Sequence, residues 1–191
     1  AIVMLCIQYM VGPKLIEWQM RIRYITESEN PRVYAMVKNL ASGAGIPMPK
    51  VGVAAIGIPN AFAFGRWKSD GRVCVTEGIL KLLNEDELRA VLAHEMSHLK
   101  NRDVLTVTLL SVIPIVLYHI AMNNLYYGRY RRREGNNSAA LIGMAAMLLY
   151  FVTNLLVLYA SRIREYFADR GAVSLGCAPS NLASALYKLV Y

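Results

Sequence analysis

Two long apolar runs most strongly constrain how this chain can fold. Leu105–Met122 and Ala139–Ser161 contain no Lys, Arg, Asp or Glu. A helix needs about 20 such residues to cross a bilayer, and a proline such as Pro114 is tolerated there. The alternative is a pair of buried core helices in a soluble protein. Two such runs among 191 residues, with a mean hydropathy of +0.33 for the chain, favour a membrane protein.

A His-Glu-x-x-His pattern at residues 94–98 indicates the chemistry. Positions i and i+4 of a helix share one face, so His94 and His98 can bind one metal ion. The Glu95 carboxylate beside that ion can take a proton from metal-bound water. Asn84 and Glu87 predict a capped start for this helix. The alternative, a surface helix with two solvated histidines, does not explain why two of the chain's three histidines occur here.

A catalytic zinc ion needs a third protein ligand, since such sites combine three protein ligands with a water. The remaining histidine, His119, lies in an apolar run remote from the first two, and the three cysteines are scattered. Glu165 is the better candidate. It lies four residues before Asp169 on a predicted helix, so one carboxylate can bind metal while the other accepts an imidazole N–H. Alternatively, both acids pair with neighbouring arginines at positions 162, 164 and 170.

Four segments, in this order and spacing, resemble the HtpX heat-shock membrane proteases, gluzincin-type metalloproteases related to the CAAX prenyl endopeptidases. They are PNAFAFG at 59–65, VCVTEGIL at 73–80, HEMSHLKNRD at 94–103 and SRIREYFADRGA at 161–172. The resemblance implies one Zn²⁺ per chain, bound by His94, His98 and Glu165. It also implies Glu95 as the catalytic general base and Asp169 as the hydrogen-bond partner of His94.

The expected fold class is α+β: a zincin-like catalytic domain of active-site helices and a small sheet, with an inserted transmembrane helical hairpin. Residues 1–12 are expected to be the end of an incomplete N-terminal transmembrane helix. The catalytic domain then comprises 13–104 and 161–191, and the hairpin 105–160 with a polar loop at about 124–138. Helix is predicted from Lys14 to about Leu40, with a second start at Pro31, and strands at Val51–Ile56, Ala61–Phe64 and Arg72–Thr76.

An exposed sheet edge is the expected substrate site, because an extended peptide can add to such an edge through backbone hydrogen bonds. By the resemblance, this edge is formed by Asn60, Ala61, Phe62 and Ala63, and an ordinary interior strand is the alternative. Asp103, after the zinc helix, either orients a ligand or caps the membrane helix. Three residues are equally open as donors to the oxyanion of the reaction: Asn60, Arg164 and Tyr166.

The chain carries a net charge of +8. A nucleic-acid partner is not expected, because the basic residues gather beside the apolar runs, where they meet lipid headgroups, and no RNA-binding or zinc-finger motif occurs. Basic residues on the side of the zinc helix predict a cytoplasmic active site. The opposing loop contains four arginines that argue the other way, Arg129, Arg131, Arg132 and Arg133. The larger number of charges and the resemblance favour the cytoplasm.

The predicted function is a multi-pass cell-membrane zinc endopeptidase that, by the resemblance, cleaves misfolded or damaged membrane proteins during stress. One alternative is a CAAX-type prenyl-protein endopeptidase, for which the chain has too few spans to enclose a membrane chamber. Another is a non-proteolytic zinc-binding membrane protein, which has no need of Glu95 between two ligands. The expected partners are unfolded or membrane-protein substrates and the lipid bilayer. The sequence indicates no oligomeric state.

Overall fold

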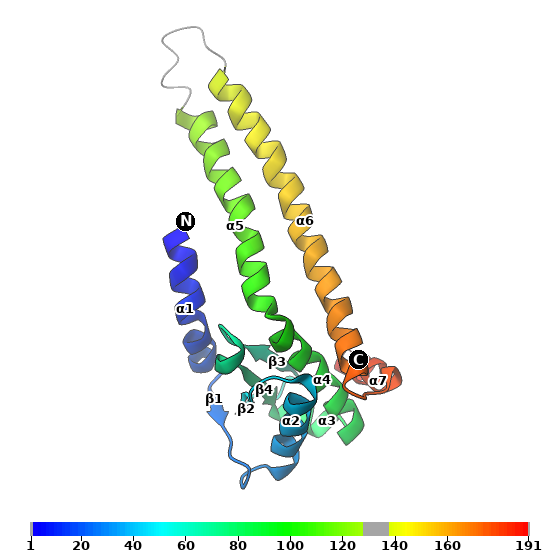
Figure 1. Cartoon of the computed structure of the whole chain (residues 1–191). Coiled ribbons are helices and arrows are strands. Elements are labelled where there is room, and N and C mark those ends of the chain that lie inside the picture. The colour runs from blue at the N-terminus through cyan, green and yellow to red at the C-terminus, as the bar shows by residue number, and fades with distance from the viewer. Residues whose placement is uncertain (1, 128–137, 191) are drawn as a thin grey trace. The chain divides into compact units, whose positions relative to one another are not determined.

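A computed structural model describes residues 2–127 and 138–190 of the chain (Figure 1). The chain divides into two compact units. The helical unit comprises the residues up to 6 together with 106–163, and the mixed unit comprises 7–105 together with the residues from 164 onward.

A four-stranded sheet lies in the mixed unit, in the order β1 (Ile22–Tyr24), β2 (Lys50–Ala54), β4 (Arg72–Thr76) and β3 (Ala61–Phe64). β2 and β4 run parallel, whereas β1 pairs antiparallel with β2 and β3 pairs antiparallel with β4. β3 and β4 have the predicted limits, and β2 ends two residues earlier than predicted. β3 is an edge strand, since β4 is its one neighbour in the described sheet.

β1 differs from the sequence prediction, which placed helix at these residues. Helix α1 (Ile2–Gln19) continues past residue 12, where the membrane helix was expected to end. Arg21 then adopts a left-handed backbone conformation, with φ of 48°, which a right-handed helix cannot contain. The three residues that follow pair with β2, Ile22 lying opposite Ala54. Pairing with a distant strand, rather than local pattern, therefore determines β1.

Four further helices belong to the mixed unit: α2 (Pro31–Ala44), α3 (Glu77–Leu82), α4 (Glu85–Asn101) and α7 (Pro179–Val190), with a 3-10 turn, η1 (Lys68–Asp70), between β3 and β4. α2 begins at Pro31 as predicted. The core between helices and sheet is aliphatic, and its large, fully buried side chains include Val33, Val37, Leu40, Val73, Val75, Ile79, Leu88, Leu92 and Met96. Because burying each contributes about 1.5–3 kcal/mol, this core holds α4 firmly in place.

The helical unit consists mainly of α5 (Asp103–Met122) and the first part of α6 (Ser138–Ser174), with a π-helical turn, η2 (Asn123–Tyr127), after α5. Both predicted apolar runs are therefore helical. Asp103–Tyr126 and Ser138–Ser174 are long and apolar enough to cross a membrane, and only 11% of the apolar window in each is buried. The rings of Tyr118 and Tyr150 lie 5.5 Å apart, so the two helices contact each other (Figure 1). Most of the predicted polar loop, including its four arginines, lies outside the described residues.

α6 also carries the segment predicted to hold the third metal ligand. The sequence placed the limit between the membrane hairpin and the second part of the catalytic domain at 160/161, without stating whether the helix continues across it. The structure contains one helix of 37 residues there, from Ser138 to Ser174. The hydropathy changes near Ser161, but no proline interrupts the segment, so the backbone hydrogen bonds continue without a break.

Candidate metal centre and active site

α4 begins with the predicted capping interaction. The Glu87 N–H donates to Asn84 Oδ1 at 2.9 Å, and the Asn84 N–H donates to Glu87 Oε2 at 3.0 Å. The buried Glu87 carboxylate also accepts hydrogen bonds from Ser184 Oγ at 2.7 Å and Lys188 Nζ at 2.8 Å, both on α7. The start of α4 is thus fixed by its own cap and by α7, and this sets where its later residues lie.

These contacts predict a pH dependence of stability. Lys188, the Asn84 N–H and Ser184 lower the pKa of Glu87 from 4.5 to about 2, so Glu87 stabilises the fold above about pH 4.5 and loses that effect as the pH falls toward 2. We expect Glu87→Gln to lower the melting temperature by several degrees at pH 7, and this difference from the parent chain to shrink between pH 4.5 and 2.

Thermal unfolding followed by circular dichroism would measure this difference in detergent. Glu85→Gln is the matched control, because its exposed carboxylate forms an ion pair with exposed Arg32 and such surface pairs contribute little. A Glu87→Gln difference that stayed constant from pH 7 to 2 would contradict the prediction.

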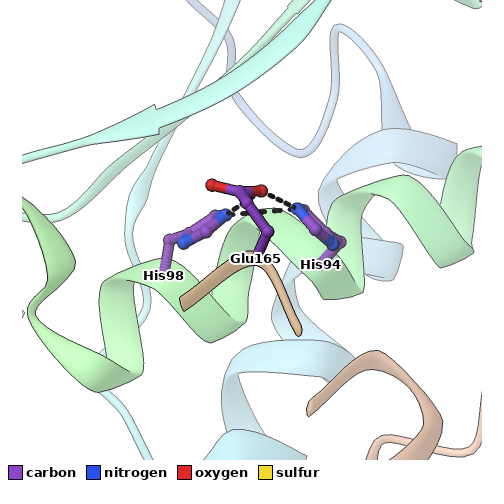
Figure 2. A group of neighbouring side chains, drawn as sticks. All are labelled: His94, His98 and Glu165. Atoms are coloured by element: carbon purple, nitrogen blue, oxygen red, sulfur yellow. Dashed lines mark hydrogen bonds and ion pairs between the residues drawn. The ribbon is translucent and has the colours of Figure 1, made fainter. Parts of the chain in front are cut away.

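The two histidines of α4 lie beside Glu165 of α6, and all three are within the mixed unit (Figure 2). The Nε2 atoms of His94 and His98 are 3.1 Å apart. Glu165 Oε2 lies 3.4 Å from His94 Nε2 and 3.6 Å from His98 Nε2. The imidazoles are less than one fifth exposed, whereas the Glu165 side chain is 60% exposed. The structure therefore brings together the three ligands predicted from residues 94–98 and 165.

The spacing of these three atoms fits one zinc ion. Ligand atoms at about 2.0–2.1 Å from a tetrahedral zinc lie about 3.3 Å from one another, close to the 3.1, 3.4 and 3.6 Å observed. Two imidazole nitrogens and a carboxylate oxygen are also the donor types that zinc prefers. Without a cation or a proton between them, the lone pairs on these atoms would repel one another.

Each imidazole also contacts a carboxylate through its other nitrogen. His94 Nδ1 lies 2.9 Å from Asp169 Oδ1, as predicted, and His98 Nδ1 lies 2.5 Å from Asp103 Oδ2. A carboxylate can only accept, so Nδ1 is the protonated nitrogen in both rings and Nε2 is free to bind metal. The sequence left the role of Asp103 open between orienting a ligand and capping the membrane helix. The structure places its carboxylate against His98, one of the candidate metal ligands.

Glu95 is the acid between the two ligands, and it faces the sheet. Its Oε2 accepts a hydrogen bond of 2.9 Å from the backbone N–H of Ala63 in β3. Burial raises the pKa of Glu95 to about 7, and the negative charge of Glu165 adds to this, while His98 and the Ala63 N–H act in the opposite direction. A carboxylate with a pKa near neutral pH suits a general base. A bound dication would lower this pKa, because positive charge favours the ionised form.

The predicted substrate residues lie along β3 and just before it. Ala63 contacts Glu95, so this part of the edge strand lies beside the residue that separates the first two candidate metal ligands in the sequence. Asn60 is held through its backbone: its N–H donates to Thr76 Oγ1 at 2.9 Å, and its carbonyl accepts from the Thr76 N–H at 3.0 Å. The rings of Phe62 and Phe64 stack at 5.9 Å. The edge position confirms that β3 is not an interior strand.

α4 and α6 approach closely on another side of α4. A Cβ atom added to Gly171 of α6 would lie 2.1 Å from Ser97 Oγ and 2.7 Å from Ser97 Cβ, well inside van der Waals contact. Ser97 is itself buried, and its hydroxyl donates to the Ala93 carbonyl at 3.0 Å. Small residues at positions 97 and 171 therefore permit the helix separation at which the ligands from α4 and α6 meet.

Known proteins are similar to this chain in sequence and in fold. The model of peptidase family M48 matches residues 27–190. The chain belongs to peptidase family M48. The matched residues include both histidines of α4, Glu165 and Asp169. The candidate metal centre therefore lies within the part of the chain that the family model matches.

Curated proteins that are similar in sequence to this chain confirm the resemblance to HtpX. The M48 chain is 52% identical over 184 residues to "Protease HtpX homolog" of Methanothermobacter thermautotrophicus, covering 96% of this chain and 69% of that protein. It is 39% identical to "Protease HtpX homolog 2" of Methanosarcina mazei, covering 95% of this chain and 63% of that protein. The chain thus spans about two thirds of the length of these relatives.

A solved structure shows the same fold. The crystal structure of Ste24p from S. mikatae matches 98% of the M48 chain with a TM-score of 0.63, although the sequences are only 19% identical. The match covers 49% of the Ste24p chain. The fold of this chain is therefore similar to that of Ste24p.

Proposed function

We propose that this chain is the zinc-binding part of a membrane-bound endopeptidase that cleaves peptide bonds of misfolded or damaged membrane proteins. The observation that carries the proposal is the cluster of His94, His98 and Glu165, whose ligand atoms all lie within 4.8 Å of one another, with the Glu95 carboxylate beside it. A structural zinc site would use four protein ligands and would not need a buried acid between two of them.

His94, His98 and Glu165 would hold the zinc ion. When bound, zinc supplies the Lewis acidity that activates water and polarises a carbonyl group. Glu95 accepts the proton of the attacking water on its carboxylate and then delivers it to the leaving amine. The hydrogen bonds from His94 to Asp169 and from His98 to Asp103 keep each Nε2 free of its proton.

The edge strand β3 would bind the substrate. A peptide that lies along Asn60–Ala63 can form backbone hydrogen bonds to the free edge, which recognises extended chains with little regard to their side chains. Misfolded proteins expose such extended segments. Because Ala63 contacts Glu95, a peptide added at this strand would pass beside the general base.

The membrane arrangement is part of the proposal. α5 and α6 would form an inserted transmembrane hairpin, and the catalytic domain would be zincin-like and formed by residues 13–104 and 161–191. The exposed apolar side chains of α5 and α6 support the transmembrane hairpin, and they include Leu109, Ile113, Leu148, Phe151, Leu155 and Leu158. The protein would be a multi-pass protein of the cell membrane with its active site in the cytoplasm.

Metal removal tests the proposal. The detergent-solubilised chain, loaded with one zinc ion, should cleave a chemically unfolded protein. Dialysis against a chelator should remove the cleavage, and one equivalent of zinc should restore it. A prenylated C-terminal peptide in a parallel reaction distinguishes an endopeptidase of the CAAX type, which would prefer it. Zinc binding with cleavage of neither substrate would contradict the proposed activity.

A further inference from the structure

The Asp103 carboxylate lies between the two metal-ligand helices. One oxygen, Oδ2, is 2.5 Å from Nδ1 of His98 on α4, and the other, Oδ1, is 3.0 Å from Nε of Arg164 on α6. Arg164 directly precedes the ligand Glu165. The Asp103 side chain is only 7% exposed. One buried carboxylate therefore touches a metal ligand of the first helix and the immediate neighbour of a metal ligand on the second.

The backbone before Asp103 is turned so as to place it there. Arg102 adopts a left-handed conformation, with φ of 55° and ψ of 44°, between the end of α4 and the start of α5. This conformation is unfavourable for a residue other than glycine, and such strained residues persist where the surroundings require them. Had α4 continued as a regular helix, the residue five positions after His98 would not share its face.

Arg164 depends on Asp103 for its charge balance. Its side chain is 16% exposed, and its Nε and Nη1 atoms are buried without a hydrogen-bond partner among the described residues. The contact at 3.0 Å is consequently an ion pair, in which the N–H is not aligned with the carboxylate oxygen. Asp103 is the one acid in an ion pair with Arg164 in the described part of the chain.

We infer that Asp103 is a positioning residue: it fixes the ring of His98 with Nε2 toward the metal and, through Arg164, holds the Glu165 segment of α6 beside α4. This inference rests on the proposed zinc site and specifies how that site is assembled. A lower zinc affinity, by about 10–100-fold, is expected when such a partner of a ligand imidazole is removed.

A different explanation is that Asp103 only balances the buried charge of Arg164 and begins α5, where an acid is favoured at the helix N-terminus. The two explanations predict different zinc affinities for a variant that lacks both the Asp103 carboxylate and the Arg164 guanidinium. Removing the Asp103 carboxylate alone leaves the buried Arg164 charge uncompensated, and under both explanations this destabilises the folded protein. Deleting Arg164 as well removes that charge, but it does not restore the hydrogen bond to His98.

The experiment measures the zinc dissociation constant by competition with a chromophoric chelator, and thermal stability in parallel, for the detergent-solubilised chain. Asp103→Ala should bind zinc about 10–100-fold more weakly than the parent. The double variant Asp103→Ala with Arg164→Met should recover stability but not zinc affinity. Asp103→Asn should bind more tightly than Asp103→Ala, because the amide oxygen still accepts from His98. Asp86→Ala, an exposed acid in the first turn of α4, is the matched control.

Two results would overturn the inference alone: a zinc affinity of Asp103→Ala within twofold of the parent, or a double variant that recovers affinity together with stability. A parent chain that bound no zinc would overturn the proposed function and the inference with it. Should Asp103→Ala fail to fold, the comparison of Asp103→Asn with the double variant decides between the two explanations in the same way.

Discussion

The Glu95→Gln variant should bind zinc as the parent chain does and cleave peptide bonds on the order of 10²–10⁴-fold more slowly. An amide cannot accept the proton of the attacking water, so the general base is lost. The metal ligands are untouched, because Glu95 is not among the three residues whose ligand atoms converge. The Gln side-chain oxygen can still accept from the Ala63 N–H, as Glu95 does at 2.9 Å, so β3 and α4 should keep their contact.

Cleavage of an unfolded protein by parent and variant, at matched zinc content, measures this effect. Glu85→Gln provides the control, because it makes the same chemical change at an exposed position of the same helix. Equal cleavage by parent and Glu95→Gln would show that a contaminating protease performs the reaction. Loss of zinc from Glu95→Gln would instead assign this residue to the metal ligands.

The second large effect is expected for Glu165→Ala, which should lose both zinc and proteolysis. Removal of a direct ligand should weaken zinc binding by more than the roughly 10–100-fold that follows loss of an outer hydrogen-bond partner. Folding should be little affected, because the Glu165 side chain is 60% exposed and its contacts in the described structure are with the two ligand imidazoles. The melting temperature of the metal-free variant should therefore match that of the metal-free parent.

Zinc content after gel filtration, determined by atomic emission, distinguishes Glu165 from its neighbour on the same helix. Asp169→Asn is informative beside it, since the amide oxygen can still accept from His94 Nδ1 and most of the zinc should be retained. One equivalent of zinc retained by Glu165→Ala would contradict the assignment of Glu165 as a zinc ligand. It would also show that the third ligand comes from residues outside this cluster.

Local signals predicted the parts of the site that depend on neighbours in sequence. The capping pair Asn84 and Glu87 and the four-residue spacing of the histidines both lie on one helix, and both are present as predicted. β3 and β4 were also delimited correctly, helped by the turn residues Ser69, Asp70 and Gly71 that separate them. The pairing of Glu165 with this helix required more than local pattern, and it came from ligand chemistry and the resemblance to HtpX.

Other features of the structure could not be predicted from the local sequence pattern. β1 exists through pairing with β2, and its three residues are too few for their alternation to predict a strand. The contact from Asp103 to His98 depends on the left-handed conformation of Arg102, and arginine gives no signal for such a turn. The sequence analysis also did not predict that the membrane run and the Glu165 segment form one continuous helix. The hydropathy changes near residue 160, but between Met144 and Arg170 the sequence contains neither glycine nor proline to interrupt the helix.

The close approach of Gly171 to Ser97 has a consequence for how this protein can vary. Position 97 is one of the two unspecified residues in the His-Glu-x-x-His pattern, so the chemistry of the metal does not restrict it, but the partner helix does. A side chain at position 171 is accommodated only if position 97 becomes smaller or the helices separate, and a residue larger than serine at position 97 requires that 171 stay glycine. Among related chains, the two positions should therefore covary, and a designer who alters one should change both together.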